Sequence, residues 1–175
     1  MRVALTYSSA IDLELDGTGA GGLGDLSATM PQSVNLEFQS GVAANTLVFG
    51  SVRWAEWSKG NITDAAFGDL VSWDDDVMTY TLGVGRKFSD SFSAALSVGY
   101  EKALGGTTSN LAPTDGYTSI SLGGTYTLDN GIELTGGVRY IMAGDATGDP
   151  IGPFGNATFE DNSAIAVGLK VAYNF

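Results

Sequence analysis

The carboxylates best placed to hold a metal ion are consecutive in the chain, at Asp74, Asp75 and Asp76. Carboxylate oxygens are the ligands that Ca²⁺ and other hard divalent cations prefer. The sequence contains no histidine and no cysteine that could complete a site of another kind. Two interpretations of the cluster therefore stay open, namely solvated charge on a loop and a site for a divalent cation.

Basic side chains are rare, and three of them stand at polar positions between apolar residues. The chain has 8 lysines and arginines against 20 aspartates and glutamates. Arg53, Arg139 and Lys170 would all point away from the apolar face if their segments are β-strands. We expect these cations either to pair with acidic side chains on the same face, such as Glu37 and Glu101, or to bind the carboxylate of a ligand.

The composition excludes most catalytic mechanisms. Without histidine and cysteine the chain has no Ser-His-Asp triad, no catalytic thiol and no disulfide. A net charge of -12 and an isoelectric point near 4.1 argue against a nucleic-acid partner, because phosphate binding needs a basic face. We predict that the protein is not an enzyme and uses no cofactor.

Two motifs with known chemistry lack the context that this chemistry needs. Residues 17–22 match the G-x-G-x-x-G pattern of dinucleotide-binding loops, which must be followed by a helix. Here Pro31 and another strand-like segment follow, so we interpret residues 17–22 as a loop. Asp12, Glu14 and Asp16 resemble the opening of a calcium-binding loop, but its twelfth position is Leu23, which cannot chelate.

Apolar residues alternate with polar or small ones along most of the chain, a period of two that is typical of β-strands. Ile120 and Leu122, for example, alternate with Ser119, Ser121 and Gly123. Tilted strands of roughly 9–11 residues can cross the hydrocarbon layer of a membrane. We therefore predict eight strands, at residues 3–15, 33–39, 46–57, 78–88, 92–101, 119–128, 132–140 and 167–175.

The connections between these segments are alternately long and short. Residues 41–45, 89–91 and 129–131 are short turns, and the Asn130-Gly131 pair favours a type I′ hairpin. The long polar connections are residues 17–30, 58–75, 103–116 and 143–158. Long extracellular loops and short periplasmic turns are typical of outer-membrane barrels. We predict an all-β protein, an antiparallel up-and-down transmembrane β-barrel in a single domain over residues 1–175, with both termini in the periplasm of a Gram-negative bacterium.

Aromatic residues gather toward both ends of the predicted strands, as in the girdles that mark lipid–water interfaces. A soluble β-barrel is the alternative, but it would place polar residues outside and carry more basic residues. We expect outer-membrane lipid and lipopolysaccharide around the protein, with divalent cations at the outer loops if the aspartate cluster binds them. The aromatic residues are Phe38, Phe88, Phe92, Tyr126, Tyr173 and Phe175 on the short-turn side, and Trp54, Trp57, Trp73, Tyr80, Tyr100 and Tyr140 on the other.

Several strings resemble the FadL/TodX family of outer-membrane transport proteins for long-chain fatty acids and other hydrophobic compounds. Residues 2–9, RVALTYSS, resemble a late strand of that family, and residues 30–32, MPQ, resemble the lead-in to its next strand. Residues 47–58, LVFGSVRWAEWS, resemble the strand after that. The last five residues, VAYNF, resemble the C-terminal signature of outer-membrane barrels in general.

The resemblance covers the C-terminal part of the family's larger barrel, and no signal peptide or N-terminal hatch is recognisable in these 175 residues. It implies a part of a channel for passive uptake of long-chain fatty acids or other hydrophobic molecules. The alternative is a complete small barrel of eight strands with a structural or adhesive role and no transport. The strands either close on themselves or form a curved open sheet with residues 3–15 and 165–175 as its edges.

Overall fold

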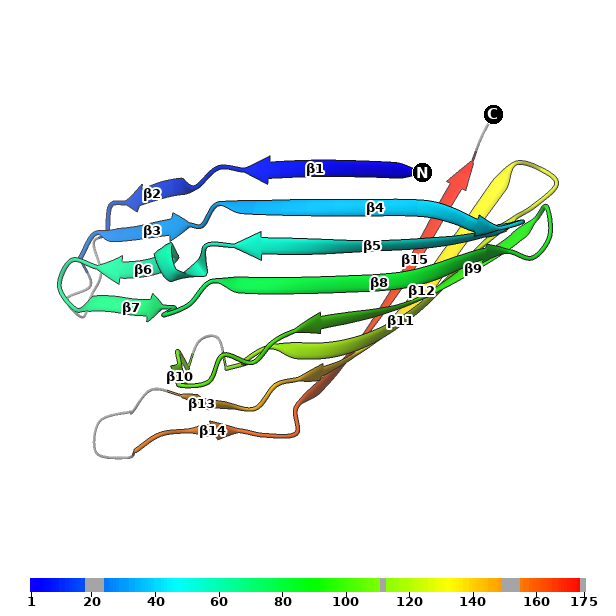
Figure 1. Ribbon diagram of the computed structural model, residues 1–175. Helices are drawn as coiled ribbons and strands as arrows, with labels where there is room; N and C mark the ends of the chain where they lie inside the picture. The colour runs from blue at the N-terminus through cyan, green and yellow to red at the C-terminus, as the bar shows by residue number, and fades with distance from the viewer. Residues whose placement is uncertain (18–23, 111–112, 149–154, 174–175) are drawn as a thin grey trace.

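One large antiparallel sheet of eight strands forms most of the computed structural model, which describes residues 1–17, 24–110, 113–148 and 155–173 (Figure 1). Its strands follow one another in chain order and confirm the eight strands expected from the alternation. In order across the sheet they are β1 (Arg2–Ser8), β4 (Ser33–Ala43), β5 (Thr46–Ala55), β8 (Val77–Lys87), β9 (Phe92–Glu101), β11 (Tyr117–Thr127), β12 (Ile132–Ala143) and β15 (Ser163–Tyr173).

The register places apolar and polar side chains on opposite faces of this sheet. Leu122 of β11 lies opposite Leu96 of β9 and Val138 of β12. Its chain neighbour Ser121 lies opposite Ser97 of β9, on the other face. Leu122 is 54% exposed, and the described part of the chain buries only three hydrophobic side chains. The apolar face therefore has no protein layer over it there, as is typical of strands that face lipid.

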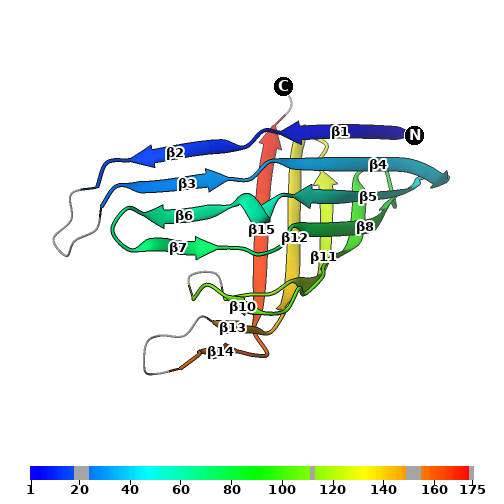
Figure 2. The ribbon, with the colours of Figure 1, turned by 60° about the vertical axis from the view of Figure 1, so that its left-hand side comes forward.

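The sheet curls strongly from β1 to β15 and stays open. Among the described residues, β1 pairs with β4 alone and β15 with β12 alone. Figure 1 and Figure 2 show β15 crossing the direction of β1 instead of running beside it. Of the two outcomes that the sequence leaves open, the described strands adopt the curved open sheet. In lipid, the free backbone groups of such edges need further strands as partners.

Three short turns join the strands at one end of the sheet, where the sequence predicts them. The turn between β4 and β5 contains Asn45, whose φ of 57° is positive. The turn between β11 and β12 is not the predicted type I′ hairpin, because Gly131 has a positive φ of 85° and Asn130 does not. The Leu128 N–H donates to the Ile132 carbonyl at 2.7 Å, which fits a longer loop that ends in a glycine bulge.

Two smaller sheets consist of short strands that lie in the long connections and that the alternation does not predict, apart from residues 11–15, which belong to the strand predicted at 3–15. β2 (Ile11–Leu15), β3 (Leu26–Met30), β6 (Asn61–Asp64) and β7 (Gly68–Ser72) form a second sheet. β10 (Thr107–Thr108), β13 (Ala146–Gly148) and β14 (Thr158–Phe159) form a third. The strand predicted at 3–15 is divided at residues 9–10, although β2 and β3 continue the register of β1 and β4. Strands as short as two residues are missed because they show too few alternations.

The one described helix is a single 3-10 turn, η1 (Trp57–Lys59). Within the described ranges no helix is long and apolar enough to cross a bilayer.

Candidate functional site on the polar face

The side chains of the polar face form successive rows, because the register keeps the partners on neighbouring strands level with each other. The first row lies nearest the long connections, and the last lies nearest the short turns. The rows are Arg53, Thr79, Glu101 and Tyr117; Ser51, Thr81, Gly99, Ser119 and Ile141; Phe49, Gly83, Ser97, Ser121 and Arg139; Leu47, Gly85, Ala95, Gly123, Gly137 and Gly168; and Lys87, Ser93, Thr125, Thr135 and Lys170.

The structure places Arg53, Arg139 and Lys170 on the polar face but does not bring them together. Arg53 belongs to the row that reaches Ala143 of β12, and Lys170 to the row that reaches Thr135 of the same strand. Arg139 lies midway between these two rows. Four residues of strand span about 13 Å, so the three cations lie at three separate levels. A ligand-binding role for them stays a prediction.

Arg139 lies against the wall of the sheet without an acidic partner. Its Nη2 donates to Ser119 Oγ at 2.9 Å, and its Cζ lies 5.3 Å from the centre of the Tyr117 ring. Gly99 leaves room for the Ser119 hydroxyl, since a Cβ on that residue would lie 2.7 Å from Ser119 Oγ. The Nε–H is buried without an acceptor, and no ion pair in the described chain includes Arg139.

The three consecutive aspartates have different surroundings. Asp76 accepts hydrogen bonds from the Ser58 hydroxyl at 2.6 Å and from Trp54 Nε1 at 3.0 Å. The hydrogen bond from the Ser58 hydroxyl is the main cause that lowers the pKa of the Asp76 carboxyl below its ordinary value. Desolvation acts in the opposite direction, and the hydrogen bond from Trp54 lowers the pKa further. Asp74 and Asp75 are exposed and line a cavity of about 340 Å³.

The surroundings of Asp74 and Asp75 do not include a ready metal site. No group of three or more ligating side chains lies together in the residues that the structure describes. Asp76 instead joins the end of β5 to the start of β8 through its bonds to Trp54 and Ser58. The divalent-cation site at the aspartate cluster therefore stays a prediction.

An apolar hollow lies in the polar face near the short turns. Its volume is about 690 Å³, and its lining combines Leu47, Phe49, alanines and glycines with polar residues that include Lys87 and Thr135. Part of the lining comes from the row of small residues that runs from Gly85 to Gly168, where almost no side chain projects from the wall. The alternation of apolar and polar residues does not predict this hollow, although the glycines at alternate positions are a signal for it.

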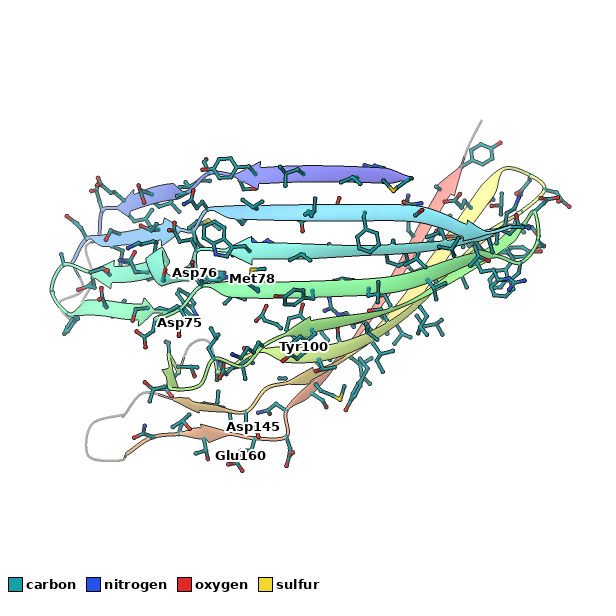
Figure 3. The ribbon with its side chains drawn as sticks, in the orientation of Figure 1. Asp75, Asp76, Met78, Tyr100, Asp145 and Glu160 are labelled. Atoms are coloured by element: carbon teal, nitrogen blue, oxygen red, sulfur yellow. The ribbon has the colours of Figure 1, made fainter. Side chains whose placement is uncertain are left out.

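Charge is divided between the long connections and the polar face of the sheet. Residues 9–32, 56–76, 102–116 and 144–162 hold 15 of the 20 acidic residues and two of the eight basic ones, a net charge of -13. Figure 3 shows Asp75 and Asp76 just before β8, and Asp145 and Glu160 beside β13 and β14, all at the end with the long connections. The polar face has the opposite sign, with Arg2, Arg53, Lys87, Arg139 and Lys170 against Glu37, Glu101 and Glu133.

The aromatic residues expected near the long connections lie in two places. Tyr80 and Tyr100 are register partners on the apolar face, and Figure 3 shows Tyr100 where β9 approaches this end. Trp57 and Trp73 are not part of that girdle. Their ring centres are 4.6 Å apart, and both line the cavity beside Arg53. Phe175, most of the glycine motif at residues 17–22, and Leu23 lie outside the described residues.

A curved sheet with one apolar and one polar face is typical of a class of proteins, the transmembrane β-barrels. In these proteins the apolar face of the wall contacts lipid and the polar face lines the interior. No protein-family model and no curated protein matches the chain. Among solved structures, the chain is similar to a Pseudomonas aeruginosa FadL homologue, with a TM-score of 0.68 and 14% identity over 97% of this chain and 47% of that one.

Two further solved structures have the same fold. A TodX deltaS2S3 mutant monoaromatic hydrocarbon channel gives a TM-score of 0.66 and 17% identity over 99% of this chain and 46% of that one. The Pseudomonas putida toluene transporter TodX gives 0.53 and 16% over 79% and 39%. The resemblance to the FadL/TodX family is thus confirmed at the level of the fold, and the chain spans about half the length of the first two similar structures.

Proposed function

We propose that residues 1–175 form part of the wall of an outer-membrane channel for the passive uptake of hydrophobic small molecules. The observation that carries the proposal is the apolar hollow of about 690 Å³ in an otherwise polar inner face. A lumen that passes only water and ions has no use for Leu47 and Phe49 on that face, whereas a hydrophobic solute gains free energy by leaving water for them. Movement down a concentration gradient needs no energy source and no catalytic group.

The wall is the C-terminal portion of a larger barrel in this proposal. The free edges of β1 and β15 and the similarity to about half of longer channels support it. Strands from the rest of the barrel would pair with both edges and satisfy their backbone groups. The short turns then lie in the periplasm with both termini, and the acidic connections lie outside, among the headgroups of lipopolysaccharide.

Long-chain fatty acids are the proposed substrates, together with neutral hydrophobic compounds. Two of the similar structures are a monoaromatic hydrocarbon channel and a toluene transporter, which supports apolar solutes for those proteins. For this chain, the apolar hollow suits a hydrocarbon tail or ring, and the excess of cations on the polar face suits a carboxylate.

Uptake by a Gram-negative host that lacks its own fatty-acid channel tests the function. We expect the complete barrel that contains residues 1–175 to raise the uptake of labelled oleate and toluene. Phe49→Asp should abolish most of the gain, because it places a charge in the hollow, while Ser51→Asp on the same strand and face should not. Equal uptake by the wild type and the empty host, at normal amounts of folded protein, would refute the proposal.

The alternative role is structural or adhesive, and the net charge of -13 at the outer end favours it as a surface for partners. The same assay separates the two roles. A structural protein would leave oleate and toluene uptake at the level of the empty host, and Phe49→Asp would change nothing.

A further inference from the structure

A cavity of about 340 Å³ lies beside Arg53, at the end of the polar face with the long connections. It is separate from the apolar hollow near the short turns, because no residue lines both. Trp57, the segment before β8 and the connection after β9 form most of its wall, and Figure 3 shows Asp75 where the chain enters β8. The size of the cavity suits a small organic molecule.

Two half-buried tryptophans form the aromatic part of this wall. The ring centres of Trp57 and Trp73 are 4.6 Å apart, and the ring planes are tilted by 51°. The buried residue Gly60 lies against both rings, since a Cβ there would lie 3.0 Å from Trp57 Cε3 and 3.4 Å from Trp73 Cε3. The rings are therefore held in place before a ligand arrives, which lowers the entropic cost of binding.

A hydrogen bond joins the segment of Trp57 to the segment of the aspartates. Ser58 follows Trp57 in η1, and its hydroxyl donates to Asp76 at 2.6 Å. Asp76 follows Asp75 in the chain, so this bond keeps the chain at Asp74 and Asp75 close to the aromatic pair.

Asp74 and Asp75 follow Trp73 directly and bring two negative charges to the cavity. Both side chains are exposed, and the hydrogen bonds of this cluster belong to Asp76. No ion pair in the described chain includes Asp74 or Asp75. Their carboxylates are therefore available to neutralise a cation.

The other charged groups around the cavity leave it negative. Glu101 and Asp115 add two carboxylates, and Arg53 and Lys102 are the two cations of the lining. Glu101 already accepts a hydrogen bond from Thr79 at 2.8 Å. The long connections carry a net charge of -13, which adds to the attraction for cations.

An organic cation fits this combination better than a metal ion does. Ca²⁺ takes about six to eight oxygen ligands, and no group of three or more ligating side chains lies together among the described residues. An alkylated ammonium ion gains free energy from contact with the face of tryptophan, the best of the aromatic side chains for this purpose. Nearby carboxylates neutralise such an ion without having to coordinate it.

We propose that the cavity beside Arg53 binds a small alkylated ammonium ion, with its alkyl groups against Trp57 and Trp73 and its charge neutralised by Asp74 and Asp75. The inference goes beyond the proposed uptake of hydrophobic molecules, because it adds a site for a charged, water-soluble ligand at the end with the long connections.

Fluorine NMR of the complete barrel that contains residues 1–175, labelled with fluorotryptophan, tests the site. Choline and its uncharged isostere 3,3-dimethylbutanol are titrated in a neutral polyoxyethylene detergent at low salt, and Trp57→Phe and Trp73→Phe assign the signals. We expect choline to shift the signals of Trp57 and Trp73 and to reach half-saturation at a concentration at least about tenfold below that of the isostere. Trp54 does not line the cavity, and its signal should shift far less.

Two variants separate the charge from the rings. Asp74→Asn/Asp75→Asn keeps the shape of the cavity and should reduce the preference for choline to about twofold or less, because the remaining charges nearly balance. Trp73→Leu keeps an apolar surface without a π face. It should weaken choline binding about fivefold and change the binding of the isostere by less than about twofold, with the Trp57 signal as the readout.

Glu160→Gln/Asp161→Asn is the matched control, because it also removes two consecutive acidic charges from a long connection, and neither residue lines the cavity. It should keep the preference for choline. Three results would overturn the inference: equal binding of choline and the isostere by the wild type, no response of the Trp57 and Trp73 signals to choline, or a loss of preference as large in the control as in Asp74→Asn/Asp75→Asn. The proposed function would stand in each case, because the cavity and the hollow share no residue.

Discussion

Single carboxylates stabilise the long connections of this molecule. Asp64 is 1% exposed. Its two carboxylate oxygens accept hydrogen bonds from the backbone N–H groups of Ala66 at 2.8 Å, Phe67 at 2.9 Å and Gly24 at 3.0 Å. It thereby fixes the turn between β6 and β7 and links that turn to Gly24, two residues before β3. Its role is structural and is not visible from its place in a polar connection.

Replacement of Asp64 by alanine should loosen the second sheet. Three backbone donors lose their acceptor, and a buried donor without a partner costs about 1–3 kcal/mol, so we expect a local loss of about 2 kcal/mol or more. Limited proteolysis of the folded protein should cut the region of β6 and β7 faster. Asp69→Ala is the control, because Asp69 accepts only one exposed bond, from Thr63. Equal cleavage of both variants would contradict the role of Asp64.

Acid should weaken the hydrogen bonds by which Asp76 links Trp54 and Ser58 to the start of β8. Its pKa is lowered in the folded state, chiefly by the Ser58 hydroxyl, so its contribution to stability is present above its ordinary value of 3.8 and is lost as the pH falls below that value. Trp54 donates to the same carboxylate, so its fluorescence should report the loss. Asp76→Asn should be less stable at pH 7 and should show a smaller change between pH 5 and about pH 3. An unchanged acid transition would argue against this junction.

At the scale of the strands, glycines decide where large side chains can lie flat on the wall. A Cβ on Gly83 would meet the Phe49 ring of β5 and would lie 2.8 Å from Ser97 Cβ of β9. Phe49 therefore covers Gly83 and stays close to the sheet instead of filling the hollow. On the apolar face, Phe38 covers Gly50 in the same way.

Gly83→Ala should destabilise the sheet by about 1–3 kcal/mol, as overpacking does, and push the Phe49 ring toward the interior. Chemical unfolding in detergent measures the first effect, and oleate uptake should fall with the second. Gly168→Ala is the control, because a Cβ there has nothing within 4 Å. Its unfolding free energy should stay within about 0.5 kcal/mol of the wild type. Similar losses for both variants would show that Phe49 is not the reason.

At the scale of the whole molecule, the two faces of the sheet define an inside and an outside. Leu122 and Ser121 are chain neighbours at the middle of β11, but Leu122 lies on the apolar face and Ser121 on the polar one. The same division holds along the other seven strands of the large sheet. It places the excess cations on the polar face and leaves the net charge of -13 at the end with the long connections.

Lysine substitutions at these two neighbours test the orientation. Leu122→Lys should cost about 2–4 kcal/mol of unfolding free energy in a lipid bilayer, because it places a charge near the middle of the hydrocarbon. Ser121→Lys should cost much less, since it faces the polar interior. Denaturant unfolding from liposomes measures both. A larger cost for Ser121→Lys would mean that the faces are reversed.

The sequence by itself determined the eight long strands, the alternation of short and long connections, and the face of the charged residues that alternate with apolar ones in those strands. These properties are local, because a period of two assigns every residue to a face once one neighbour is assigned. The sequence therefore placed Arg53, Arg139 and Lys170 on one face. It did not show the strands β3, β6 and β7, whose pairing stabilises them more than their own short patterns do.

Only the tertiary structure decided which groups meet across the strands. Arg139 comes from β12, Ser119 and Tyr117 from β11, and Gly99 from β9. The hollow likewise depends on residues as far apart as Leu47 and Gly123. These contacts depend on the register between the strands, which many residue pairs along the sheet set together. No single segment sets the register, and for this reason the contacts of Arg139 with Ser119 and Tyr117 appear only in three dimensions.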